Sequence, residues 1–111
     1  MPKNVVLASS ARQTSHEHAG LTYRTFVDAK PRLTFVQYFF EAGMEVPPHS
    51  HGDEEQGVYC VSGRFAESLG GEDFEFGPGD GFYIPPGAAH GIRCIEKGSY
   101  LMCTSKVPKD K

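Results

Sequence analysis

The sequence predicts an all-β fold, a sandwich or a closed antiparallel barrel, and three observations lead to this prediction. The chain holds 13 glycines and 8 prolines in 111 residues, a share well above the average of roughly 12%, so turns must be frequent. Short segments rich in β-branched and aromatic residues lie between these turns, as β-strands do. No window of about 11 residues carries the apolar stripe of an amphipathic helix. Short strands at close intervals are typical of sandwiches and barrels.

Each expected strand is bounded by turn residues. Leu21 to Val27 is rich in β-branched and aromatic residues, and Leu33 to Phe40 is the clearest strand because LTFVQYFF is largely apolar. Glu72 to Phe76 alternates acidic and aromatic residues, which is typical of a half-buried strand. Gly70-Gly71 predicts a two-residue hairpin turn, since both glycines can adopt positive φ. In chain order the expected strands are 21–27, 33–40, 57–61, 64–69, 72–76, 82–84, 91–94 and 99–105, with a turn at Ser62-Gly63 and a further strand possible within residues 1–20.

Length, charge and cysteine content narrow the class of protein. A chain of 111 residues predicts one domain, residues 1–111, with a core at about 20–105. A net charge of −3 and a pI of 5.9 give no attraction for a nucleic-acid backbone. No stretch approaches the roughly 18 apolar residues that span a bilayer, and the first residues lack the apolar segment of a signal peptide. Three cysteines in apolar segments, without CxxC spacing, favour a reduced, cytoplasmic protein.

Three histidines form the candidate site. His49 and His51 are two residues apart, so in an extended strand their imidazoles project from one face. Pro47 and Pro48 precede them and place this strand end at an edge or rim, because proline cannot continue a ladder. His90 directly follows the rigid turn Pro85-Pro-Gly87 and its two alanines. Three histidines and one oxygen ligand are a common set for Zn, Ni, Mn or Fe(II).

The two histidine segments resemble the two motifs of the cupin superfamily. In the first, Gly43 is followed by five residues, His49-x-His51, four residues, Gln56, six residues and Gly63. In the second, Gly79 is followed by five residues, Pro85-x-Gly87, two residues and His90. The resemblance implies a single cupin domain with a cupin-type antiparallel β-barrel, the double-stranded β-helix or jelly roll. It also implies one divalent metal ion, Zn, Ni, Mn or Fe, with the ligands His49, His51, Gln56 and His90.

Two positions depart from the cupin pattern. The acidic ligand position holds Gln56 if Gly63 sets the register; the alternative places Glu55 there, with Ser62 in place of the closing glycine. Gln56 is favoured because a glycine permits the positive-φ conformation that serine resists. A neutral glutamine leaves the site with one more positive charge than a glutamate would. The second motif ends in Cys94 where the pattern has asparagine, and this puts only local packing in doubt.

The run from Glu55-Gln56 through Tyr59-x-Val61 to Gly63-Arg-Phe65 is similar to small cupins of pectin degradation, which open the ring of unsaturated uronates. The resemblance implies a small, anionic carbohydrate-derived or hydroxy-acid substrate and ring-opening, isomerase or lyase chemistry. A cupin dioxygenase that uses Fe, Ni or Mn is the alternative, and a non-enzymatic binding or sensing module is a third. We expect a homodimer, because similar proteins pair or exchange N-terminal strands to protect their sheet edges.

Strand parity assigns the remaining residues. Counted from Gln56, Val58 and Cys60 point into the barrel and Tyr59 and Val61 point outward. By the same count Ile92 and Cys94 share the face of His90 as packing residues. The catalytic candidates are Glu55, a carboxylate beside the ligand set, and Arg93, which could hold a substrate carboxylate although its parity directs it away from His90. A second pair, His16-x-His18, has no spaced partner, and we expect it in an N-terminal loop.

Overall fold

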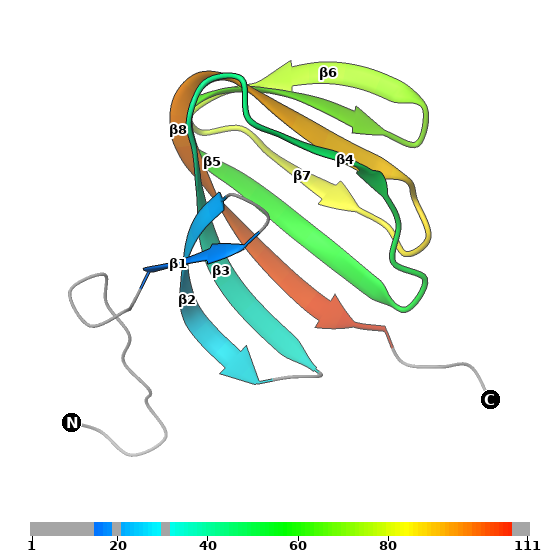
Figure 1. Ribbon diagram of the computed structural model, residues 1–111. Coiled ribbons are helices and arrows are strands. Elements are labelled where there is room, and N and C mark those ends of the chain that lie inside the picture. Colours follow the sequence, from blue (N-terminus) through cyan, green and yellow to red (C-terminus); the bar gives the residue numbers. More distant parts are fainter. Residues whose placement is uncertain (1–14, 19–20, 30–31, 108–111) are drawn as a thin grey trace.

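The computed structural model describes residues 15–18, 21–29 and 32–107. These residues form eight antiparallel β-strands and no helix, so none of them forms a helix that could span a membrane. The strands are β1 (Ser15–His18), β2 (Leu21–Ala29), β3 (Leu33–Phe40), β4 (Glu45–His49), β5 (Glu54–Leu69), β6 (Glu72–Phe76), β7 (Gly81–Ile84) and β8 (His90–Lys106) (Figure 1). The all-β prediction is confirmed.

The strands form two layers that share the two longest strands, β5 and β8 (Figure 1). In one layer β1, β2 and β3 continue into the second half of β8, which pairs with the first half of β5, and β7 completes the edge. In the other layer β4 pairs with the first half of β8, which pairs with the second half of β5 and then β6. This is a jelly roll, and its interior lies between the two layers.

A glycine crossing lets β5 and β8 pass from one layer to the other. The pairing register of these strands shifts between Cys60 and Phe65, where Gly63 has φ of 81°. A Cβ on Gly63 would lie 2.5 Å from the Glu96 carbonyl oxygen, so only glycine fits this approach. The expected turn at Ser62-Gly63 is therefore wrong: the chain kinks through a bulge and continues as one strand. For the same reason the expected strands 91–94 and 99–105 are halves of β8.

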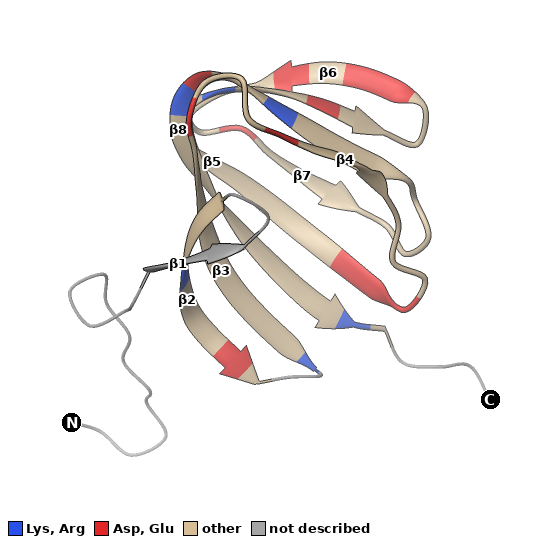
Figure 2. Cartoon of the chain, viewed as in Figure 1, with Lys and Arg blue, Asp and Glu red and all other residues tan. Residues whose placement is uncertain are grey.

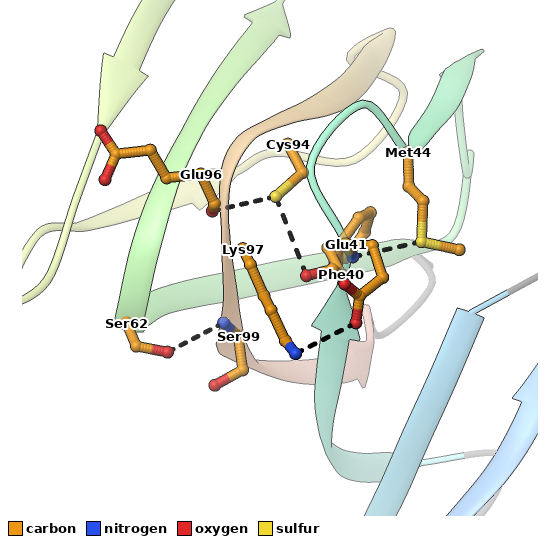
Figure 3. Close-up of polar contacts among 8 residues, drawn as sticks. All are labelled: Phe40, Glu41, Met44, Ser62, Cys94, Glu96, Lys97 and Ser99. Atoms are coloured by element: carbon orange, nitrogen blue, oxygen red, sulfur yellow. Dashed lines mark hydrogen bonds and ion pairs between the residues drawn. The ribbon is translucent and has the colours of Figure 1, made fainter.

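Polar contacts around the sulfur of Cys94 hold this crossing together (Figure 3). The thiol of Cys94 lies 3.0 Å from the Glu96 carbonyl oxygen and 3.9 Å from that of Phe40. The backbone N–H of Ser99 donates to Ser62 Oγ at 3.2 Å, and Lys97 pairs with Glu41 at the surface. Burial raises the pKa of the Cys94 thiol, so this cysteine is a packing residue rather than a nucleophile.

Aromatic side chains from both layers fill one end of the barrel. Phe40 and Tyr100 come from one layer and Phe65 and Phe76 from the other. The Phe40 ring lies 5.4 Å from Phe65 in an edge-to-face contact and 5.5 Å from Tyr100 in a stacked one, both favourable geometries. This aromatic cluster closes the core at one end, and the space beyond it remains open as a cavity.

Strand parity is confirmed where the structure describes it. Val58 and Cys60 are 5% and 0% exposed, while Tyr59 and Val61 are 50% and 44% exposed. Ile92 and Cys94 are buried, on the same face as His90. The expected hairpin at Gly70-Gly71 joins β5 to β6, with φ of 58° and 86°.

The further strand expected within residues 1–20 is present as β1, but the loop expected at His16 and His18 is wrong. His16 and His18 lie in β1, which pairs with β2, and not in a loop. Residues 1–14 and 19–20 of the possible N-terminal strand lie outside the described residues.

Candidate metal site

The interior between the layers holds a cavity of about 470 Å³. Its walls come from both layers and are mostly apolar, with Val46, Val58, Ile84 and Ile92 among them. The polar groups that line it include the three histidines together with Glu54, Gln56 and Glu67. A partly enclosed apolar cavity with a few convergent polar groups is the usual form of a small-molecule site.

The structure brings the three predicted histidines together. His49 ends β4 and His90 begins β8, and these two residues are paired across the ladder; His51 follows two residues after His49. Their ring centroids lie 4.4 Å apart for His49 and His90, 4.9 Å for His49 and His51, and 5.6 Å for His51 and His90. The register shifts between Val46 and His49, at the two prolines, which cannot donate ladder hydrogen bonds.

Hydrogen bonds orient two of the three rings, and a carboxylate lies near the third. Nδ1 of His49 lies 3.0 Å from the Pro47 carbonyl oxygen, and Nδ1 of His90 lies 2.9 Å from that of Ala88. Nδ1 of His51 lies 3.7 Å from the Glu54 carboxylate. A ring that donates from Nδ1–H carries its lone pair on Nε2, the tautomer that binds metal. Burial lowers the pKa of His90, which favours the neutral form that ligation requires.

The donor set fits a divalent transition metal. One ligand nitrogen from each histidine lies within 4.8 Å of the others. Nitrogens bound at about 2.0–2.1 Å from one ion lie no more than about 4.2 Å apart, so small ring rotations close the site. Imidazole nitrogens suit Zn, Ni, Mn and Fe, so the residues do not select one of these metals.

Gln56 lines the same cavity as the histidines and is 8% exposed. Its Nε2 donates to Thr104 Oγ1 at 3.0 Å, and its Oε1 is buried without a hydrogen-bond partner among the described residues. Buried amide oxygens are nearly always paired, and an unpaired one is costly. The cavity is therefore lined by a free carbonyl oxygen as well as by three imidazoles.

The two catalytic candidates lie outside the cavity. Glu55 points to the opposite face of β5, where its carboxylate accepts a hydrogen bond of 2.7 Å from the Tyr83 hydroxyl. Arg93 is exposed on β8, directed away from His90 as its parity predicts. Gln56 and not Glu55 therefore lies on the histidine side of the strand, and Glu54 is the carboxylate nearest to His51.

Sequence reasoning missed Glu67. This residue is 4% exposed in the second half of β5 and lines the cavity. Burial raises the pKa of its carboxyl group to about 8. The available signal was parity: Phe65, Glu67 and Leu69 occupy one face of the strand, so a glutamate stands at a position where the pattern expects an apolar residue.

Charge is unevenly distributed over the molecule. Acidic residues are prominent on β6, and lysines and arginines are few and scattered (Figure 2). None of the described residues that line the cavity is a lysine or an arginine. A metal ion held by neutral ligands would therefore be the main positive charge available to a substrate inside.

Comparisons with known proteins agree with this geometry. The family model described as a cupin domain matches residues 36–104. The structure of KdgF from a Halomonas species is 26% identical with a TM-score of 0.79, over 92% of this chain and 93% of that one. An RmlC-like cupin from Shewanella frigidimarina is 25% identical with a TM-score of 0.80, over 93% and 91%. A predicted oxalate decarboxylase from Thermotoga maritima, with a TM-score of 0.83 over 92% and 100%, shares the fold at 16% identity. No curated protein sequence matches the chain.

Proposed function

The chain belongs to the cupin family, and from this premise we propose that it is a metal-dependent enzyme acting on a small anionic substrate. The substrate class is a carbohydrate-derived acid or a hydroxy acid, and the reaction is a ring opening, isomerisation or elimination. Opening the ring of an unsaturated uronate is the specific form we favour, because the chain is similar to KdgF and its run from Glu55 to Phe65 resembles the small cupins of pectin degradation.

The observation that carries this proposal is the unpaired Oε1 of Gln56 in the cavity that His49, His51 and His90 also line. All four ligands are neutral, so a bound divalent ion keeps its full charge. Such an ion supplies Lewis-acid polarisation of a substrate carbonyl or hydroxyl and attracts a carboxylate. Thr104 holds the Gln56 amide in the orientation that leaves Oε1 free.

The cavity suits a substrate of this size and charge. A volume of about 470 Å³ lies within the range of roughly 300–1,000 Å³ that small-molecule sites occupy. The apolar walls exclude water and strengthen the electrostatic interactions inside. Because no lysine or arginine lines the described cavity, a phosphorylated sugar finds no second cationic partner, and a monocarboxylate is the better match.

Metal content is the first test. We expect about one equivalent of divalent metal in the purified protein and none in His49→Ala/His51→Ala, measured by mass spectrometry. The metal-loaded protein should then convert a 4,5-unsaturated uronate monosaccharide. The loss of the ultraviolet absorbance of the substrate's enol ether measures this conversion. Oxygen consumption without uronate turnover would favour the dioxygenase instead. No metal after reconstitution with Zn, Ni, Mn and Fe(II) would leave a non-enzymatic binding module.

We also propose that the protein works as a homodimer in the reducing cytoplasm. Tyr59, Val61 and Tyr83 are 44–54% exposed on the outer side of β5 and β7, and exposed aromatic side chains of neighbouring strands are typical of subunit interfaces. All three cysteines are free thiols in the structure. Light scattering should give twice the monomer mass of 12.2 kDa, and a monomer mass would contradict the dimer.

A further inference from the structure

Glu67 is a buried glutamate, and the packing of the surrounding strands gives no structural reason for a carboxyl group at this position. Its side chain is 4% exposed and forms no hydrogen bond or ion pair with the described residues. Desolvation alone raises the pKa of its carboxyl group. Its ladder partners are Ile92 on β8 and Phe74 on β6, both apolar. A carboxyl group that faces the cavity with no protein partner is disfavoured in its charged form by desolvation. A residue that only filled space here would be better apolar.

The strand register places Glu67 beside the histidine cluster. Leu69 is paired with His90, and Glu67 is paired with Ile92, one step further along the same face of β5 and β8. Glu67 and His90 are thus diagonal neighbours, for which the separation is about 7–8 Å. No hydrogen bond or ion pair joins the two side chains. A small molecule held at the histidines would occupy the space between them, within hydrogen-bond reach of the Glu67 carboxyl group.

None of the described groups that face Glu67 is a lysine or an arginine that would stabilise its carboxylate form. On β8 these are His90 and Tyr100, whose hydroxyl feels the Glu67 charge, and on β3 Tyr38 lines the same cavity. On β6 the acidic residues flanking Phe74 are exposed and point away. No lysine or arginine reaches the cavity from the described residues, so no cation holds the carboxylate form.

We propose that Glu67 is the proton-transfer group of this cavity, acting on a substrate held at the histidine site. This inference rests on the proposed function, and it names the acid–base partner that the histidine and glutamine ligands cannot supply. The pKa of this carboxyl group is about 8 when the metal is absent. A divalent cation nearby lowers that pKa toward pH 7, the range in which acid–base catalysts work best.

The proton transfers balance for uronate ring opening. The hydroxyl on C1 loses its proton, the C1–O bond becomes a carbonyl, and the bond from C1 to the ring oxygen breaks with its electron pair on that oxygen. Glu67 donates its proton to the ring oxygen, which becomes an enol, and the proton released from the C1 hydroxyl restores the carboxyl group. The product is an isomer of the substrate, so no oxidant or reductant is needed.

The test compares the metal-loaded wild type with Glu67→Gln, which keeps the shape and polarity of the side chain. Glu72→Gln, at an exposed position on β6, is the matched control. Metal content, turnover of a 4,5-unsaturated uronate and the infrared band of a protonated carboxyl group at neutral pH are measured in all three proteins. We expect Glu67→Gln to bind metal normally, to lose the infrared band and to lose about 100-fold to 10,000-fold in kcat/KM, while Glu72→Gln matches the wild type.

The outcomes separate this inference from the proposed function. Wild-type turnover by a metal-loaded Glu67→Gln protein would refute the role of Glu67 and leave the proposed function standing. Loss of metal from Glu67→Gln would make Glu67 a ligand and would also refute the inference. If the wild type does not convert the uronate, the proposed reaction fails, and the infrared band then decides. Its absence from the wild type refutes a proton donor at Glu67, and its presence in the wild type and Glu72→Gln but not in Glu67→Gln supports one.

Discussion

Burial of Glu67 should make the stability of the metal-free protein depend on pH in a way that one substitution removes. The pKa of this carboxyl group rises from 4.5 to about 8 on folding. Below pH 4.5 both states hold the proton and the group has no effect. Between these two values the unfolded chain releases the proton and the folded chain retains it, so stability falls as pH rises.

The size of the effect follows from the shift. Each pH unit between the two pKa values removes about 1.4 kcal/mol, and the 3.5 units from 4.5 to about 8 set a ceiling of about 5 kcal/mol on the total. This is a large share of the roughly 5–15 kcal/mol that stabilises a small domain. In Glu67→Gln the amide does not titrate. We therefore expect the free energy of unfolding of this variant, relative to the wild type, to increase by about 1.4 kcal/mol per pH unit from pH 5 to pH 8.

Urea unfolding with a chelator present, at unit steps from pH 5 to pH 8, measures this difference. The histidines titrate in both proteins and cancel in the comparison. Glu72→Gln should follow the wild type at every pH, because Glu72 is exposed. A difference between wild type and Glu67→Gln that stays constant across this range would show that the buried carboxyl group is ionised, and would refute the reasoning.

Three further predictions concern the ligand set and the crossing. Gln56→Ala should lower metal occupancy more than Glu55→Ala, because only Gln56 lies on the histidine side of β5; metal content per protein measures both. Thr104→Val removes the hydrogen bond to Gln56 Nε2 and should weaken metal binding about 10-fold to 100-fold, measured by competition with a chelator. Gly63→Ala should cost at least about 2 kcal/mol of stability more than Gly71→Ala in thermal unfolding, because both glycines have positive φ but only Gly63 meets backbone within 3 Å.

Each of these has an outcome that would contradict it. Greater metal loss in Glu55→Ala than in Gln56→Ala would shift the motif register by one residue and place the acidic ligand at Glu55. Unchanged metal affinity in Thr104→Val would mean that the Gln56 amide needs no support from the neighbouring strand. Equal melting temperatures for the two glycine variants would mean that the crossing of β5 and β8 relaxes around a methyl group.

Local pattern was sufficient for several parts of this fold. The strands at 33–40 and 72–76 have the observed bounds, because apolar character and alternation depend on the residues themselves. The inward positions of Val58 and Cys60 followed from period-two parity alone. The spacing of His49, His51 and His90 also pointed to one cluster, because the motif encodes which strand ends meet at the mouth of the barrel.

The tertiary structure decided what depends on contacts between distant segments. The Ser62-Gly63 dipeptide has the composition of a turn, yet the close approach of residues 96–98 converts it into a bulge within one long strand. Glutamate is usually a surface residue, and only the packing of β6 and β8 around Glu67 buries its carboxyl group in the cavity. A sequence records which side of its own strand a residue occupies. What that side faces depends on how the two layers fold over each other, and this determines both the burial of a charge and the chemistry it can perform.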